Sequence, residues 1–169
     1  MNGLSPCVTL PRLLHNRLGL KRGVGRVMMA VAQHNPALQL LPVRMNDGRV
    51  LQLDLREPMA MPYLLAGEIW EEAGETEFVR SVVCPGEVAI DIGANVGWYS
   101  ALLSECVGAT GAVYAFEPME RALTMLGATA RQYPQLRVIA AALGALEGEA
   151  VIHVPARSEE RRVGKECRL

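Results

Sequence analysis

The sequence predicts an α/β fold, with short parallel strands alternating with helices that flank the sheet. Residues 88–92 and 112–116 are two apolar five-residue runs, of the kind found in buried parallel strands. A turn rich in small residues, 93–97, follows the first run and precedes apolar residues at helical spacing. The helical positions are Val96, Tyr99, Leu103 and Val107. Strand, glycine turn and helix together make the first half of a βαβ unit whose turn faces a ligand.

The chain begins with a mixed segment, 1–35, in which leucines alternate with basic residues. The basic residues are Arg12, Arg17, Lys21, Arg22 and Arg26. A frayed or partly helical leader and a membrane-surface helix both fit this composition, although glycines at 19, 23 and 25 weaken the second interpretation. Helix can resume over 26–33.

Residues 36–57 predict a β-hairpin that caps the later domain. Two strands, 38–45 and 49–55, flank Asn46-Asp47-Gly48, which is strong turn chemistry. Pro42 restricts the first strand to an edge position because it cannot donate a ladder hydrogen bond.

Residues 58–156 predict the main domain. Helices are expected over 75–83 and 120–132, a third strand over 136–140 and a fourth over 149–154. The first of these helices has Phe78, Val79, Val82 and Val83 on one face.

The residues in and beside the glycine turn restrict the chemical class of ligand that it can bind. The spacing Gly93-x-x-x-Gly97 is not the G-x-G-x-x-G that brings backbone against a pyrophosphate. Asp91, at the end of the strand, disfavours a phosphate and suits a cationic amino-acid group. Glu117 lies 20 residues beyond Gly97, where such folds place the acid that binds ribose hydroxyls. A nucleoside with a cationic tail and no phosphate fits both acids, and S-adenosylmethionine is such a molecule.

The two blocks D-I-G-A-N-V-G-W-Y-S, from Asp91, and V-Y-A-F-E-P, from Val113, resemble the FkbM family of S-adenosylmethionine-dependent methyltransferases. The family pattern is D-x-G-A-N-x-G-x-Y-[ST], a helix, then V-x-A-F-E-P. The likeness extends over about 59–154 and implies a Rossmann-like, class I methyltransferase sheet. It also implies O-methylation of a hydroxyl on a sugar or secondary metabolite.

The resemblance implies a role for each candidate residue. Asp91 would hold the cofactor ammonium, Glu117 the ribose hydroxyls, and the backbone of the glycine turn would approach the methionine portion. The candidate cofactor-binding residues are Asp91, Gly93, Ala94, Asn95, Gly97, Glu117, Ala142 and Leu143, the last two near adenine. No catalytic base is identified. Trp70 and Glu71 either line the pocket or pack.

The final segment, 157–169, is predicted to be a non-native tail. Residues 157–167 match the translation of a common sequencing-adapter oligonucleotide, and the family's K-x-D-x-E-G-like motif is missing. We therefore expect an incomplete sheet, with the first strand lacking the neighbour that a complete domain would supply.

Composition argues against several other classes of function. The net charge of −1 gives no electrostatic reason to expect nucleic acid, and no apolar run is long enough to span a membrane. Four scattered cysteines predict neither a zinc site nor a disulfide framework. We expect a cytoplasmic protein that binds a small-molecule methyl acceptor, with no metal and with no oligomeric state readable from the sequence. An NAD-dependent oxidoreductase domain and a non-catalytic fragment are the competing interpretations.

Overall fold

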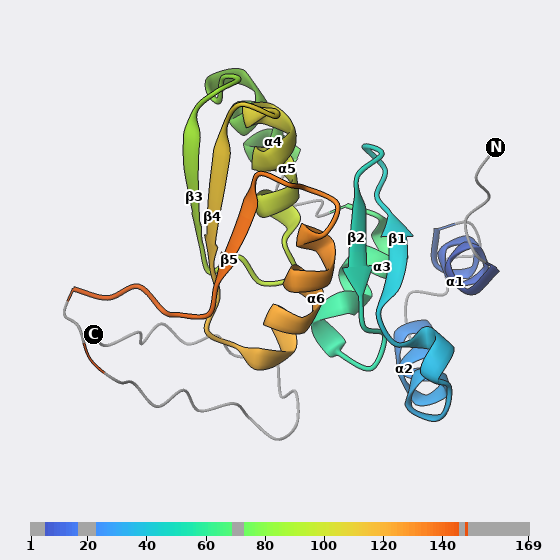
Figure 1. Ribbon diagram of the computed structural model, residues 1–169. Helices are drawn as coiled ribbons and strands as arrows, with labels where there is room; N and C mark the ends of the chain where they lie inside the picture. The colour runs from blue at the N-terminus through green and yellow to red at the C-terminus, as the bar shows by residue number, and fades with distance from the viewer. Residues whose placement is uncertain (1–5, 17–22, 69–72, 146–147, 149–169) are drawn as a thin grey trace.

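The computed structural model describes residues 6–16, 23–68, 73–145 and 148. Its N-terminal half contains two helices, a hairpin and a third short helix (Figure 1). These elements are α1 (Pro6–Asn16), α2 (Val24–His34), β1 (Leu41–Arg44), β2 (Val50–Leu53) and α3 (Met61–Ala66), with 3-10 turns at Pro36–Leu38 and Pro58–Ala60. The 70–71 pair, the expected strand 149–154 and the tail 157–169 lie outside the described residues.

The hairpin is confirmed, although its strands are shorter than expected. β1 and β2 pair antiparallel, with Leu41 opposite Leu53 and Arg44 opposite Val50. Gly48 has a φ of +96°, a conformation that glycine adopts without strain, so the tight turn forms where the sequence predicts it. The backbone N–H of Gln52 donates to the Thr129 hydroxyl at 3.0 Å, which ties β2 to a helix of the main domain.

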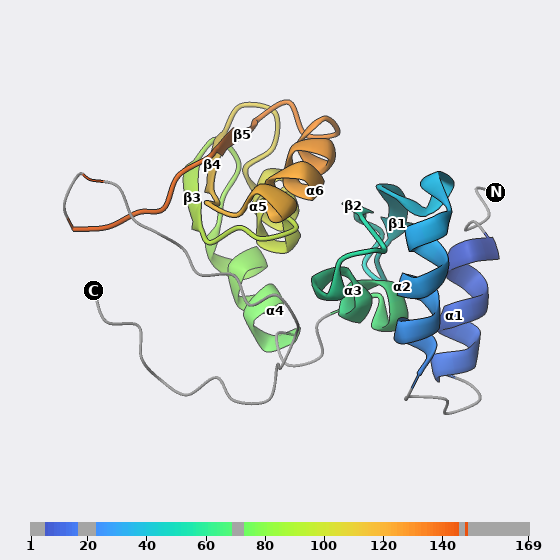
Figure 2. The ribbon, with the colours of Figure 1, turned by 90° about the horizontal axis from the view of Figure 1, so that it is seen from below.

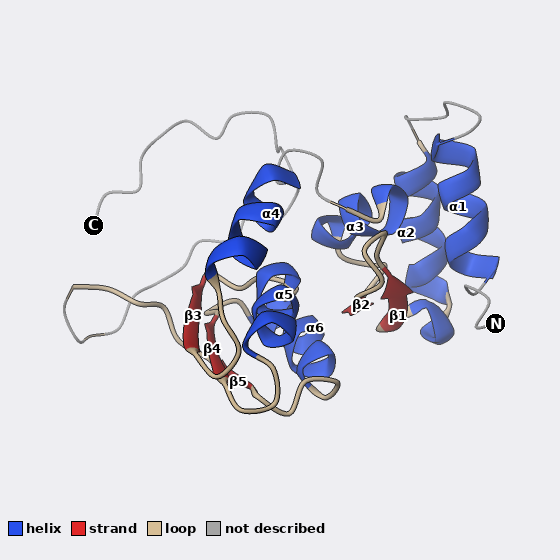
Figure 3. Cartoon of the chain, turned by 90° about the horizontal axis from the view of Figure 1, so that it is seen from above, coloured by secondary structure: helices blue, strands red, loops and turns tan. Residues whose placement is uncertain are grey.

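From residue 73 onward the predicted main domain alternates helices and strands, as expected. Its elements are α4 (Ala73–Val82), β3 (Val88–Ile92), α5 (Trp98–Val107), β4 (Ala112–Phe116), α6 (Glu120–Ala130) and β5 (Leu136–Ile139). The three strands form a parallel sheet in the order β3-β4-β5. Helices α5 and α6 lie together on one side of this sheet (Figure 3). The fold is therefore the α/β arrangement that the sequence predicts.

Strand β3 departs from the prediction of a buried strand. Val88, Ile90 and Ile92 are 66%, 60% and 65% exposed, whereas Ala89 and Asp91, on the other face, are partly buried. The reason is that α5 and α6 cover only one face, and within the described residues no helix covers the other. β3 is also an edge strand of the described sheet.

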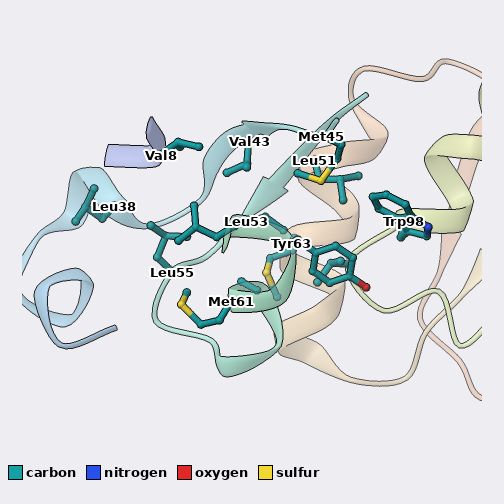
Figure 4. Packing of buried hydrophobic residues seen from close by; sticks show 14 of the residues in the cluster. Val8, Leu38, Val43, Met45, Leu51, Leu53, Leu55, Met61, Tyr63 and Trp98 are labelled. Carbon is teal, nitrogen blue, oxygen red and sulfur yellow. The ribbon is translucent and has the colours of Figure 1, made fainter. Parts of the chain in front are cut away.

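Two hydrophobic clusters hold the described parts together. The larger joins the N-terminal elements to the start of α5, and Figure 4 shows Tyr63 and Met45 close to Trp98. The smaller lies between the sheet and its helices and includes Val107, Val113, Leu126 and Leu136. Residue Trp98 thus belongs to the cluster of the N-terminal half, although it begins a helix of the sheet domain.

The apolar face predicted for helix α4 is more exposed to solvent than its sequence pattern suggests. Phe78 and Val82, two members of its predicted apolar face, are largely exposed to solvent. The helix contacts α5, and the Tyr99 hydroxyl donates to the Glu75 carboxylate at 2.9 Å.

Candidate functional site at the carboxyl ends of β3 and β4

The two predicted acids lie at the same edge of the sheet. Asp91 pairs in register with Ala115, and Glu117 stands two residues after Ala115, just beyond the end of β4. Because side chains alternate between the two faces of a strand, both acids are on the side of the sheet that the helices cover. The negative charge of Glu117 contributes to raising the pKa of Asp91. The structure therefore places Asp91 and Glu117 at the same edge of the sheet.

The glycine turn is held by its own backbone. The N–H groups of Gly93 and Ala94 both donate to the Phe116 carbonyl, at 2.9 and 3.0 Å, and the Gly97 N–H donates to the Ala94 carbonyl at 2.8 Å. Gly93 and Gly97 have φ values of +77° and +92°, and a Cβ on Gly97 would stand 2.9 Å from the Leu126 side chain. These glycines are required by backbone conformation, and at Gly97 also by close packing.

Glu117 completes the turn from the neighbouring strand. It is only 5% exposed, and each carboxylate oxygen accepts a backbone N–H, from Asn95 at 2.9 Å and from Met119 at 2.8 Å. Asn95 has a φ of +50°, a left-handed conformation that Asn tolerates better than most residues. Glu117 therefore fixes the shape of the turn, and each of its oxygens keeps a second lone pair for another donor.

The Asp91 carboxylate has a hydroxyl partner on α5. The Ser100 hydroxyl donates to Asp91 at 2.5 Å. Burial raises the pKa of Asp91 above its ordinary value, the nearby charge of Glu117 adds to this effect, and the hydrogen bonds from Ser100 oppose it. No role is predicted for Ser100 from the sequence, although the family pattern has Ser or Thr at this position.

A buried arginine connects the hairpin to the start of α5. The Arg49 guanidinium lies 4.1 Å from the centre of the Trp98 ring and donates to the Trp98 carbonyl and, at 2.6 Å, to the Asp47 carboxylate. Since Trp98 directly follows Gly97, this contact fixes the residue at which the turn becomes helix. The sequence carries no local signal for the contact, because its partners are 49 residues apart.

The remaining candidates lie further along the chain. Ala142 and Leu143 are exposed in the segment that follows β5, beyond its last residue, Ile139. Strands β3, β4 and β5 run parallel, so this segment leaves the sheet at the edge where Asp91 and Glu117 lie. Within the described ranges, no group of three or more His, Cys, Asp or Glu side chains could hold a metal ion.

A scan against protein families matches residues 91–166 to the methyltransferase FkbM domain. The matched range begins at Asp91 and contains the glycine turn and Glu117. It also extends ten residues into 157–169, so the non-native origin of that segment stays a prediction. A comparison with curated proteins returns no match.

Solved structures of methyltransferases resemble the chain in part. A SAM-dependent methyltransferase from Aquifex aeolicus is 22% identical with a TM-score of 0.37, over 52% of this chain and 43% of that one. A SAM-dependent O-methyltransferase from Thermotoga maritima is 19% identical with a TM-score of 0.40, over 61% of this chain and 41% of that one. The chain spans about two fifths of the length of these structures. By sequence, residues 91–166 match the methyltransferase FkbM domain, and this match is what relates the chain to that family.

Proposed function

We propose that the protein is the cofactor-binding part of an S-adenosylmethionine-dependent methyltransferase. The observation that carries the proposal is that the carboxylates of Asp91 and Glu117 lie at one edge of the sheet, beside a turn whose backbone amides already donate within the protein. Four turn amides, at Gly93, Ala94, Asn95 and Gly97, donate to acceptors within the protein. A pyrophosphate requires such donors, whereas an ammonium group and ribose hydroxyls require acceptors. This arrangement favours S-adenosylmethionine over NAD.

The donor and acceptor chemistry of the site fits this cofactor. Asp91 offers a carboxylate to an ammonium group, and Glu117 offers its remaining lone pairs to ribose hydroxyls. The Asn95 side-chain oxygen is buried and has no hydrogen-bond partner among the described residues, so it is a further acceptor at the same turn. Gly93 is exposed, and no atom lies within 4 Å of the place where its Cβ would be, so the turn leaves space beside its backbone.

The bound cofactor would supply an electrophilic methyl group on a sulfonium. The residues of this chain would orient it: Asp91 at the amino-acid end, Glu117 at the ribose, and Ala142 and Leu143 beside the adenine. Glu117, held by two backbone amides, is preorganised, so little side-chain entropy is lost when a ligand binds. No residue is assigned as the base that would accept the proton of the methylated group.

We further propose a small-molecule hydroxyl, on a sugar or secondary metabolite, as the methyl acceptor, with no nucleic-acid substrate and with the cytoplasm as the location. Support comes from the family match and from the overall negative charge. No helix among the described residues has the length and apolar character needed to cross a membrane. Transfer of a labelled methyl group to hydroxyl acceptors, with amine acceptors and RNA as comparisons, tests this part.

Titration calorimetry with S-adenosylhomocysteine and with NAD tests the cofactor. We expect S-adenosylhomocysteine to bind more tightly, and Asp91→Asn to weaken its binding by about 10-fold or more, the value of a charge-assisted hydrogen bond. Glu77→Gln, an exposed change on α4, is the matched control and should have no effect. Tighter NAD binding would favour an oxidoreductase. A cooperatively folded chain that binds neither ligand would favour the non-catalytic interpretation.

A further inference from the structure

Two buried N–H donors, at the point where the hairpin meets α5, lack an acceptor. The Arg49 guanidinium uses its Nε and Nη1 atoms, which donate to the Asp47 carboxylate and to the Trp98 carbonyl. Its Nη2 is buried and has no hydrogen-bond partner in the described part of the chain, and the same holds for the indole Nε1 of Trp98. A buried donor without an acceptor destabilises a fold, so two such groups in one place call for an explanation.

Both donors belong to one stacked pair. The Arg49 Cζ atom lies 4.1 Å from the centre of the Trp98 ring, so Nη2 and Nε1 are near enough for the two oxygens of one ligand group to reach both. The Arg49 side chain is fully buried, and Trp98 is 5% exposed. Figure 4 shows the Trp98 nitrogen pointing away from the other residues of its cluster, so this N–H is turned out of the apolar packing.

The stacked pair lies beside the candidate cofactor site. In Figure 2 the hairpin strand β2 lies between α6 and the outer helices α1 and α2, and the tip of this hairpin contacts the first residue of α5. Trp98 directly follows Gly97, the last residue of the glycine turn, and the Ser100 hydroxyl donates to Asp91 at 2.5 Å. A group bound by Arg49 and Trp98 would therefore lie beside the turn without using the carboxylates assigned to the cofactor.

The two donors favour an anionic ligand group. An indole N–H and a guanidinium N–H donate but do not accept hydrogen bonds, so an ammonium group finds no partner there. The positive charge of Arg49 is only partly balanced, because its acid, Asp47, also pairs with Arg80 at 3.3 Å. Arg80 lies 3.4 Å from Glu105 as well, but both of these side chains are exposed, where an ion pair is weak. A carboxylate offers two oxygens to two donors, and a guanidinium is its strongest partner among side chains.

We propose that Arg49 and Trp98 bind a carboxylate of the methyl acceptor. This inference rests on the proposed methyltransferase function, and it restricts the acceptor to a hydroxyl compound that also carries an acid, such as a hydroxy acid or a uronic sugar. Burial strengthens the selection, because a ligand without acceptor atoms leaves both donors unpaired away from solvent. A bridging water is the other occupant that would pair them, and the experiment distinguishes the two.

Magnetic resonance of the indole N–H groups in the isotope-labelled full chain tests the proposal. The chain has two tryptophans, so the spectrum of Trp70→Phe assigns the Trp98 signal. Glucuronate, glucose and glucosamine share one ring and carry a carboxylate, no charge and an ammonium group. With S-adenosylhomocysteine present, glucuronate should shift the Trp98 signal in a saturable way, and the other two sugars should shift it much less. No shift with glucuronate, as expected for a bridging water only, would overturn the proposal, and so would equal shifts with glucose.

Two variants and a matched control locate the site. Trp98→Phe keeps the ring and the backbone carbonyl but removes the N–H, so it should weaken glucuronate binding in calorimetry by about 10-fold or more. Arg49→Lys keeps the charge but loses the planar fork and should weaken binding to a similar extent. Tyr114→Phe removes a polar atom from a ring on the uncovered face of the sheet and should have no effect.

Circular dichroism of each variant separates a lost site from a lost fold. Trp98→Phe and the parent spectrum test the proposal even if Arg49→Lys unfolds. Equal effects of Trp98→Phe and Tyr114→Phe would refute the assignment to this stacked pair.

Titration of the parent chain with S-adenosylhomocysteine separates this inference from the proposed function. Binding of S-adenosylhomocysteine without a glucuronate-induced shift of the Trp98 signal would overturn the carboxylate site alone. A glucuronate-induced shift without S-adenosylhomocysteine binding would keep the carboxylate site and overturn the proposed cofactor. The absence of both would overturn both.

Discussion

Replacing Glu117 by Ala is the sharpest test of how the turn is held. The change removes the acceptor of two backbone N–H groups, those of Asn95 and Met119. Hydrogen bonds to a charged group contribute about 1.5–3 kcal/mol each, and water can partly replace the carboxylate at these half-buried amides, so we expect a loss of about 2–4 kcal/mol in the free energy of unfolding. Glu117→Gln keeps one acceptor oxygen and should lose roughly half as much.

Urea denaturation followed by circular dichroism measures this loss. With a typical m-value, the midpoint of unfolding should fall by roughly 1–2 M in Glu117→Ala. Glu77→Ala, an exposed change, should stay within about 0.5 kcal/mol of the parent chain. If Glu117→Ala loses less than about 1 kcal/mol, the carboxylate does not hold the turn and the reasoning fails.

Three further results are expected. Gly97→Ala should destabilise the chain by about 1–3 kcal/mol, because φ is +92° and the new Cβ would crowd a leucine, whereas Gly74→Ala, inside a helix with open space, should be neutral or stabilising in the same melt. Because the pKa of Asp91 is raised and an ammonium ligand needs the ionised acid, calorimetry should show that the affinity for S-adenosylhomocysteine rises with pH through the acid range. Ser100→Ala removes a hydrogen bond that favours the ionised form, so it should move that rise to higher pH. An unmoved pH profile would contradict the hydrogen bond. Ile90→Thr, on the uncovered sheet face, should change stability by less than about 0.5 kcal/mol in urea titration, and a loss as large as that of a buried residue would show that this face is covered.

Local patterns predicted most of the regular structure. The strand-turn-helix at 88–107 follows from signals within a few residues of each other, namely an apolar run, glycines that need positive φ, and helical spacing. The same holds for the hairpin, where Asn46-Asp47-Gly48 fixes the reversal. Helix α3 was not predicted, because its six residues give too short a window for periodicity.

Contacts between distant residues could not be predicted in the same way. The sequence placed Asp91 and Glu117 at one edge, but it gave no sign that Glu117 is buried under two backbone amides. Nor did it indicate that Arg49 lies buried against Trp98. The exposure of Ile90 was missed for a related reason: an apolar run indicates what a strand prefers to contact, not which neighbours are present to cover it.

The contact between Arg49 and Trp98 has a consequence for protein engineering. The Arg49 guanidinium lies on the Trp98 indole and donates to the Trp98 carbonyl, next to the glycine turn. A chimera that exchanges the hairpin should therefore keep the conformation of the turn only if Arg49 and Trp98 are transferred together. A foreign hairpin without the arginine would leave the indole face and that carbonyl to water, at the first residue of α5. Recombination breakpoints between 50 and 97 would separate this pair, whereas breakpoints before 36 would keep it intact.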